Sequence, residues 1–333
     1  MSAGSEAVLS VDGLRVEFPR AGGWYPVVDD VRFEIGRGET FGLVGESGSG
    51  KTMTSYAIIG LVQALGGRVS GSVRLRGQEL TTMPERELSR VRGKRLGTIF
   101  QNPRRSLDPA YTVGEQIAET VRRHDGLSRK AAEKRAVDLL DRVGIPTAAR
   151  RVDDYPHTFS GGMAQRVMIA IALACSPELL IADEPTTALD VTVQRKILDL
   201  LRELQAETGV AMLFVSHDLG VIAEMCDQVA VMYAGQVVET AQIDALFERP
   251  LHPYTQGLLS AVPRIGQGKR LQAIEGTAPP SGSAPPGCRF MPRCAYAVVG
   301  RCDVDPLPLL ELGSHPARCV RADELSLPGV VTT

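Results

Sequence analysis

The 333-residue sequence has little net charge and no long apolar run. Its 37 basic and 39 acidic side chains leave a formal charge of −2, which gives no support to a polybasic binder of nucleic acid or of membrane surfaces. The longest purely apolar run, Val167 to Cys175, has nine residues, whereas a membrane-spanning helix needs about 20. The segment Met1 to Ser10 lacks a basic flank followed by a long apolar stretch, so we expect no secretory signal. These absences predict a chain that does not cross a bilayer.

Cysteine is scarce as well, and its distribution is uneven. Two of the six cysteines, Cys175 and Cys226, stand far apart in apolar segments that we expect to be helical, where they are expected to be inert core residues. The other four are crowded into the last 46 residues: Cys288, Cys294, Cys302 and Cys319. This crowding predicts a separate C-terminal part.

The order of the predicted elements indicates an α/β protein of about two domains. Short apolar segments predict early strands at residues 9–11, 14–18, 31–35, 40–44 and 69–75. A helical pattern runs from Lys51 to about Leu65. Farther along, strands and helices alternate over residues 179–182, 193–208, 210–215, 219–225 and 228–233, which is typical of a mainly parallel sheet. Between these parts, residues 103–166 are charged and helix-forming, with the clearest amphipathic stretch at 127–143.

The strongest motif is a phosphate-binding loop between a predicted strand and a predicted helix. It consists of Gly45, Glu46, Ser47, Gly48, Ser49, Gly50, Lys51 and Thr52, with Thr54 in the following helix completing the predicted nucleotide-binding set. Glycines let the backbone N–H groups turn toward phosphates, and the helix N-terminus points its positive end at them. We expect Lys51 to reach the β- and γ-phosphates and Thr52 to bind Mg²⁺. The alternative is a glycine-rich surface turn.

A second motif is an apolar strand, residues 179–182, that ends in two carboxylates. Asp183 would bind Mg²⁺, and Glu184 would act as the general base for an attacking water. An apolar run that ends in Asp-Glu is common for structural reasons alone. In combination with the phosphate loop it favours a nucleoside triphosphatase.

A family resemblance is carried by residues 160–165, which read SGGMAQ. This segment resembles the signature of ATP-binding-cassette (ABC) ATPases, with Met163 at a position where the family commonly has Gln. The other family motifs follow in the expected order: Gln101 after a strand, Ala188-Leu189-Asp190 just past Glu184, and His217 after the strand at 212–215. The resemblance covers roughly residues 7–245.

The resemblance implies a RecA-like P-loop nucleotide-binding domain with an antiparallel β subdomain and a helical insertion at about residues 102–165. It also implies a composite ATP site, in which Ser160, Gly161 and Gly162 of one subunit face the γ-phosphate held by the other subunit. In that site His217 would contact the γ-phosphate, Asp190 would belong to the nucleotide-binding set, and Gln101 would join the Mg²⁺ site to the membrane partner. Tyr25 is the candidate for stacking on adenine, with Trp24 or Phe18 as alternatives.

The C-terminal part of the sequence narrows the resemblance from ABC ATPases in general to one subfamily of them. Residues 252–259 (HPYTQGLL) and 285–294 (PPGCRFMPRC) resemble the extension of oligopeptide and dipeptide importer ATPases, as do residues 100–103 (FQNP) and 106–109 (SLDP). We therefore expect an ABC domain at 1–250 and a small, irregular, cysteine-rich extension at 251–333.

The four clustered cysteines leave three interpretations open. Some members of this importer subfamily carry a [4Fe–4S] cluster at this place, and Cys288, Cys294, Cys302 and Cys319 could supply its ligands. Free reduced thiols are the second interpretation, and zinc is the third, since the paired C-x2-C spacing of structural zinc sites is absent. His315 could replace one ligand, although a surface or capping role is the ordinary one.

The resemblance implies a peripheral ATPase on the cytoplasmic face of the plasma membrane that powers import of peptides or a related solute. Its implied partners are two multi-span permease subunits, a second and related ABC ATPase in a heterodimer, and an extracellular substrate-binding protein, with no nucleic acid. Its implied cofactors are ATP, Mg²⁺ and the [4Fe–4S] cluster. The alternatives are an ABC-type ATPase that acts on the ribosome or nucleic acid, and an ATPase regulated by a redox-sensing tail.

Overall fold

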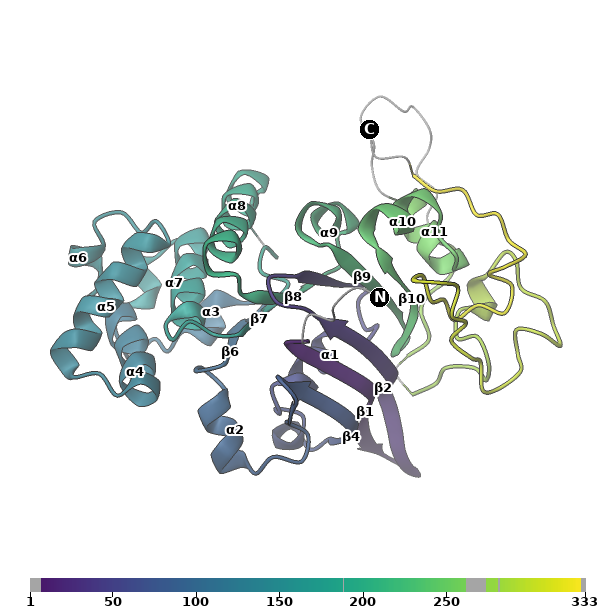
Figure 1. The fold of residues 1–333 in the computed structure, drawn as a ribbon, viewed down its shortest axis with the longest axis horizontal. Helices are drawn as coiled ribbons and strands as arrows, with labels where there is room; N and C mark the ends of the chain where they lie inside the picture. Colours follow the sequence, from purple (N-terminus) through teal and green to yellow (C-terminus); the bar gives the residue numbers. More distant parts are fainter. Residues whose placement is uncertain (1–6, 188, 262–273, 281, 331–333) are drawn as a thin grey trace. The chain divides into compact units, whose positions relative to one another are not determined.

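The computed structural model describes residues 7–187, 189–261, 274–280 and 282–330. The chain divides into two compact units (Figure 1). The first combines the chain up to Leu9 with Ile35–Glu39 and Leu75–Val215. The second combines Ser10–Glu34, Thr40–Arg74 and Ser216–Thr333. No helix within the described ranges has the length and apolar character needed to span a membrane.

The first unit contains three parallel strands, the short strand β5 and the helices around them. Its elements are β5 (Gln78–Glu79), α2 (Glu85–Val91), β6 (Leu96–Ile99), α3 (Pro103–Ser106), α4 (Val113–Asp125), α5 (Arg129–Arg142), α6 (Ala148–Arg151), η2 (Pro156–Thr158), α7 (Gly161–Leu173), β7 (Leu179–Asp183), α8 (Val191–Thr208) and β8 (Ala211–Ser216). Strand β7 lies between β6 and β8 and pairs in parallel with both. Every residue of β7 and β8 is buried, as expected for parallel strands that are covered on both faces.

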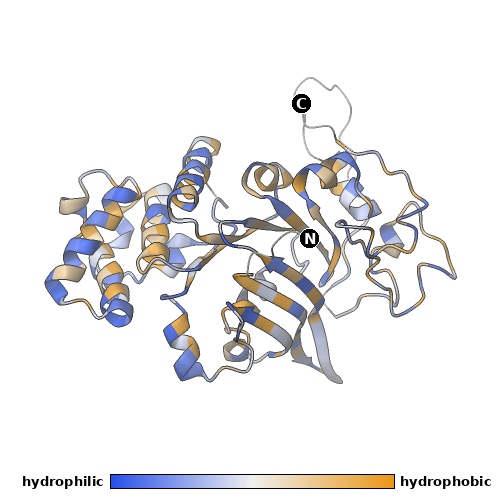
Figure 2. Cartoon of the chain, in the orientation of Figure 1, coloured by the Kyte–Doolittle hydropathy of each residue, from blue (hydrophilic) through white to orange (hydrophobic). Residues whose placement is uncertain are grey.

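The helical insertion follows local sequence signals. Thr112 and Glu115 form a reciprocal capping box at the start of α4, and the Ser128 hydroxyl accepts a hydrogen bond from the Ala131 N–H at the start of α5. In Figure 2 both helices show mixed hydrophilic and hydrophobic residues, which is the amphipathic pattern expected of helices that are buried on one side. The predicted amphipathic stretch at 127–143 therefore corresponds to α5.

The second unit contains two groups of strands and the C-terminal extension. Its elements are β1 (Leu9–Arg20), β2 (Gly23–Ile35), β3 (Thr40–Val44), α1 (Lys51–Ile58), η1 (Gln63–Leu65), β4 (Arg68–Leu75), α9 (Leu219–Met225), β9 (Gln228–Tyr233), β10 (Gln236–Gln242), α10 (Ile243–Glu248), α11 (Pro253–Ser260) and η3 (Met291–Arg293). One group has the order β2-β1-β4. In the other, β9 pairs in parallel with β3 and antiparallel with β10.

Several predicted boundaries were wrong. The segments 9–11 and 14–18 form one continuous strand, β1, and β2 begins eight residues before the predicted Val31. The helix predicted to reach about Leu65 ends at Ile58, because Gly60 adopts a left-handed conformation with φ of 69° and terminates it. Cys175 and Cys226 are buried, as expected, but lie just past the ends of α7 and α9.

Candidate functional site

The phosphate loop connects β3 to α1 in the second unit, as its sequence predicts. Lys51 is the first residue of α1 and is only 5% exposed. Its ammonium group donates to the carbonyl oxygens of Gly45 at 2.7 Å and Glu46 at 3.0 Å. The loop thus folds closely around the lysine side chain.

Two glycines of the loop are required by its geometry. Gly50, which precedes α1, has a φ of 106°, a value that other residues rarely adopt. A Cβ atom on Gly45 would lie 2.1 Å from the carbonyl oxygen of Met232 in β9. The Gly235 N–H also donates to the Ser49 carbonyl oxygen at 2.8 Å. These contacts hold the loop against the β9–β10 turn.

The neighbouring threonines differ in environment. Thr52 is half-buried, whereas Thr54 is fully buried. The Thr54 hydroxyl donates to the Gly50 carbonyl oxygen at 3.1 Å, which is a bond inside the first turn of α1. Its predicted contact with nucleotide stays a prediction.

In the first unit, the structure brings Gln101 and Glu184 together. Gln101 follows β6 and Glu184 follows β7, and the Gln101 amide nitrogen donates to a Glu184 carboxylate oxygen at 2.8 Å. The Thr187 hydroxyl donates to the same oxygen at 2.8 Å. Glu184 has a left-handed φ of 48°, and its N–H donates to the Val215 carbonyl oxygen at 2.9 Å. Strained backbone of this kind is concentrated at functional sites. Asp183, at the end of β7, is 2% exposed.

The predicted signature begins α7. The Ser160 hydroxyl caps this helix by accepting from the Met163 N–H at 3.4 Å. A Cβ on Gly162 would lie 2.5 Å from a methyl group of Val193, so this glycine permits close packing of α7 on α8. Asp190 caps α8 by accepting from the Val193 N–H at 2.9 Å. Ala188 lies outside the described residues.

The other predicted ATP-site residues lie in the second unit. His217 follows β8 and is exposed, while Asp218 caps α9. Tyr25 lies on β2, and its ring is half-buried beneath the guanidinium of Arg20. A Cβ on Gly282, in the proline-rich part of the extension, would lie 3.0 Å from the Tyr25 Cβ. The extension therefore passes beside the candidate adenine-stacking residue.

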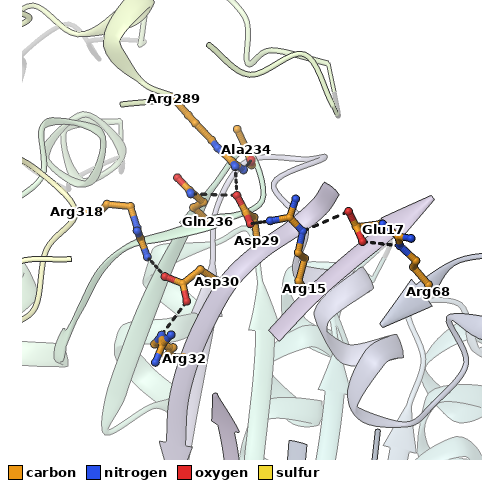
Figure 3. A network of polar contacts seen from close by, with 10 residues as sticks. All are labelled: Arg15, Glu17, Asp29, Asp30, Arg32, Arg68, Ala234, Gln236, Arg289 and Arg318. Atoms are coloured by element: carbon orange, nitrogen blue, oxygen red, sulfur yellow. Dashed lines mark hydrogen bonds and ion pairs between the residues drawn. The ribbon is translucent and has the colours of Figure 1, made fainter. Parts of the chain in front are cut away.

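Charged contacts attach the extension to β2 (Figure 3). Arg289 pairs with Asp29 and donates to the Ala234 carbonyl oxygen. Arg318, whose side chain is 7% exposed, pairs with Asp30 at 3.0 Å. The sequence analysis did not single out these arginines, because partners more than 250 residues apart leave no local pattern.

A third arginine of the extension reaches the phosphate loop. Arg293 pairs with both carboxylate oxygens of Glu46, at 2.9 and 3.1 Å. The Glu46 N–H donates to the Tyr254 hydroxyl at 2.9 Å. The sequence analysis placed Glu46 in the loop but did not predict either contact.

The four clustered cysteines line one small cavity of about 20 Å³. Burial, with a further contribution from the neighbouring cysteines, raises the pKa of Cys288 to about 11. Burial, with a further contribution from the other three cysteines, also raises the pKa of Cys319 to about 12. Within the described residues, no group of three or more His, Cys, Asp or Glu side chains is arranged to hold a metal ion. The predicted iron–sulfur cluster stays a prediction.

Two histidines near the extension have different surroundings. His252 lines the cysteine cavity and is 1% exposed. Its Nδ1 accepts from the Tyr254 N–H at 3.0 Å, and its Nε2 has no hydrogen-bond partner. His315 is not among the cavity residues, and its Nε2 lies 2.7 Å from a carboxylate oxygen of Glu239. The structure thus gives His315 a carboxylate partner rather than a place beside the cysteines.

Comparison with known proteins identifies the family. Residues 28–187 match the ABC transporter family model, and residues 238–302 match the model for the oligopeptide/dipeptide transporter C-terminal region. A Brucella abortus (strain 2308) protein, provisionally named a peptide import ATP-binding protein, is 51% identical over 94% of both chains. The chain belongs to the family of ABC transporter ATPases. The oligopeptide transport ATP-binding protein AppD of Bacillus subtilis (strain 168) is 48% identical over 95% of this chain and 97% of its own.

Solved structures agree with this family. A dimeric ATP-binding cassette bound to ADP and Pi superposes with a TM-score of 0.62 and 26% identity, covering 71% of this chain and 98% of its own. The cassette cbiO1 of Clostridium perfringens, part of an ABC transporter complex, gives a TM-score of 0.61 and 26% identity over 73% of this chain and 91% of its own. The predicted family, the RecA-like P-loop fold and the ATP-hydrolysing activity of this ABC ATPase are confirmed.

Proposed function

We propose that this ABC ATPase hydrolyses ATP to power the import of peptides through a membrane permease. One observation carries the proposal: the same chain contains the cassette motifs and the C-terminal region of oligopeptide and dipeptide transporters. Two relatives that match along nearly the whole chain have names that describe peptide import or oligopeptide transport. No observation favours a ribosomal or nucleic-acid substrate.

The phosphate loop is the proposed nucleotide-binding element. Its N–H groups and the N-terminus of α1 would hold the phosphates, and Lys51 would exchange its loop carbonyl partners for the β- and γ-phosphate oxygens. Thr52, Gln101 and Asp183 offer oxygen donors of the kind that Mg²⁺ prefers and would hold that ion. The bound Mg²⁺ would neutralise charge that develops on the phosphates.

Glu184 is the proposed general base. The donors on Gln101 and Thr187 bind one carboxylate oxygen and fix the orientation of the group, and a carboxylate held in this way can accept a proton from water. His217 would contact the γ-phosphate, and Tyr25 would stack on the adenine.

The proposed active form is a dimer of cassettes that binds to two permease subunits at the cytoplasmic face of the plasma membrane. Ser160, Gly161 and Gly162 lie at the N-terminus of α7, where backbone N–H groups favour anions. In the dimer they would meet the phosphates held by a second, related cassette, with Asp190 nearby. An extracellular protein would deliver the peptide to the permease.

The cysteine cavity is the proposed place of a [4Fe–4S] cluster. Four cysteine thiolates form the usual ligand set, and the four cysteines here line one small cavity. His252 also lines this cavity, and its Nε2 has no hydrogen-bond partner among the described residues. The cluster would supply a stable cross-link of the extension.

The proposal is tested by reconstituting the chain with its co-purified membrane subunits in proteoliposomes. We expect peptide uptake that requires ATP, and ATP hydrolysis that rises when peptide and binding protein are present. A Lys51→Ala variant should lose both activities, whereas the surface variant Lys130→Ala should retain both. Co-purification with ribosomes or DNA in place of membrane subunits would contradict the proposal.

A further inference from the structure

A partly buried ion pair connects the C-terminal extension to the phosphate loop. The Arg293 side chain is 7% exposed and that of Glu46 is 29% exposed. The two guanidinium nitrogens of Arg293 contact the two carboxylate oxygens of Glu46. Such bidentate pairs are stronger and more directional than single charged contacts.

Arg293 is held in place from all sides. Besides Glu46, it donates to the carbonyl oxygens of Ile274 and Glu275 and to the Tyr233 hydroxyl. These five hydrogen bonds use the full donor capacity of a guanidinium. A side chain held this rigidly can in turn fix the position of its partner.

The surrounding aromatic side chains reinforce this arrangement. Tyr233, Tyr254 and Phe290 pack together with ring centroids 4.6 to 5.4 Å apart. Tyr233 comes from β9 and Tyr254 from α11, and Phe290 directly precedes η3. Tyr254 uses its hydroxyl to accept the Glu46 N–H. Both the main chain and the side chain of Glu46 are therefore held by residues outside the loop.

From these contacts we infer that Arg293 is a positioning residue of the ATP site, which acts through Glu46. A carboxylate within a phosphate-binding loop repels the triphosphate. Arg293 neutralises this charge and fixes the loop in one conformation before nucleotide arrives, which lowers the entropic cost of binding. The extension thus sets the affinity for ATP in addition to any role in transport.

The same contacts place the ATP site next to the cysteine cavity. Cys294 follows Arg293 in the chain and lines the cavity, and His252 lines it two residues before Tyr254. Each of these two short segments thus has one residue that lines the cavity and another that contacts Glu46 of the phosphate loop. Any group that fills the cavity is expected to stabilise both contacts with Glu46.

The test is to measure ATP binding and steady-state hydrolysis of full-length Arg293→Gln, co-purified with its partner subunits. We expect the Kd and KM for ATP to rise about tenfold and kcat to change by less than about twofold, since the loop binds nucleotide but does not carry the base. Arg293→Lys keeps the charge but loses the bidentate contact, so its KM for ATP should lie between those of the wild type and Arg293→Gln. Arg318→Gln is the matched control, because its side chain is equally buried and pairs with β2 instead of the loop. It should leave KM within about twofold of the wild type.

A double-mutant cycle decides whether Arg293 acts through Glu46. In a Glu46→Gln background the loop no longer carries the charge, so Arg293→Gln should raise KM by less than about twofold. An unchanged KM in the single variant, an equal effect of Arg318→Gln, or a full tenfold effect in the Glu46→Gln background would each overturn the inference.

The inference rests on the proposed phosphate-loop assignment, and the two can fail separately. A Lys51→Ala variant that binds ATP like the wild type would overturn that assignment. Loss of binding in Lys51→Ala together with an unchanged KM in Arg293→Gln would overturn the role of Arg293 alone.

Discussion

The amide nitrogen of Gln101 lies 2.8 Å from a carboxylate oxygen of Glu184, although 83 residues separate them in sequence. Parallel pairing of β6 with β7 creates this contact, because both residues follow the carboxyl ends of adjacent strands. The residue proposed to join the metal site to the membrane partner therefore touches the proposed base directly.

The first prediction concerns the base itself. Glu184→Gln keeps the size of the side chain and the hydrogen bond from Thr187 but cannot accept a proton at neutral pH. General-base catalysis contributes about 10²- to 10⁴-fold, so we expect hydrolysis to fall by at least about a hundredfold with unchanged binding of Mg-ATP. Single-turnover hydrolysis and equilibrium binding measure the two quantities. Wild-type turnover in this variant would exclude Glu184 as the base.

The second prediction concerns Thr187, which the sequence analysis did not single out. Thr187→Val removes the hydroxyl that donates to Glu184 at 2.8 Å. A hydrogen bond to a charged group contributes about 1.5–3 kcal/mol, so we expect kcat to fall about tenfold. KM for ATP should stay the same, because Thr187 orients the base. Thr187→Ser keeps the hydroxyl and should keep kcat near the wild-type value, whereas a kcat as low as that of Thr187→Val would contradict this role of the hydroxyl.

The third prediction concerns the cysteine cavity. If the proposed cluster is present, anaerobically purified protein should be brown, absorb near 400 nm and contain about four iron and four sulfide per chain. Cys319→Ser should lose this absorbance. Cys226→Ser should retain it, because Cys226 is buried beside α9, away from the cavity residues. Colourless protein that contains one zinc per chain would favour the zinc interpretation.

The sequence predicted the cassette motifs well because their chemistry is local. A strand, a glycine-rich turn and a helix that follow one another in sequence place Lys51 at the start of α1, and α9 and β9 have the predicted bounds Leu219–Met225 and Gln228–Tyr233. The amphipathic pattern at 127–143 likewise located α5 (Arg129–Arg142) to within a few residues.

The contacts of the extension could not be predicted in this way. Arg293 and Glu46 are 247 residues apart, and no periodic pattern links an arginine in an irregular segment to a carboxylate in a loop. The end of α1 was missed for a related reason. The apolar pattern continues past Ile58, but the left-handed conformation of Gly60 ends the helix.

The last prediction concerns the stability of the fold in acid and depends on His252. This side chain is fully buried, and burial lowers its pKa from an ordinary value of 6.5 to about 3. Below pH 6.5 the unfolded chain therefore binds a proton that the folded chain does not bind, so stability is fully present above pH 6.5 and falls as the pH decreases. Between pH 7 and pH 5 this group alone should cost about 2 kcal/mol of unfolding free energy.

Urea unfolding of His252→Asn at the two pH values measures this contribution. Asparagine keeps an acceptor near the position of Nδ1, so it can still cap α11, but it does not titrate. We expect the variant to lose about 2 kcal/mol less than the wild type on acidification, whereas the control His157→Asn, which replaces an exposed histidine, should lose as much as the wild type. Equal losses in the wild type and His252→Asn would contradict this prediction, because His252 would then take up a proton in the folded chain as readily as in the unfolded chain.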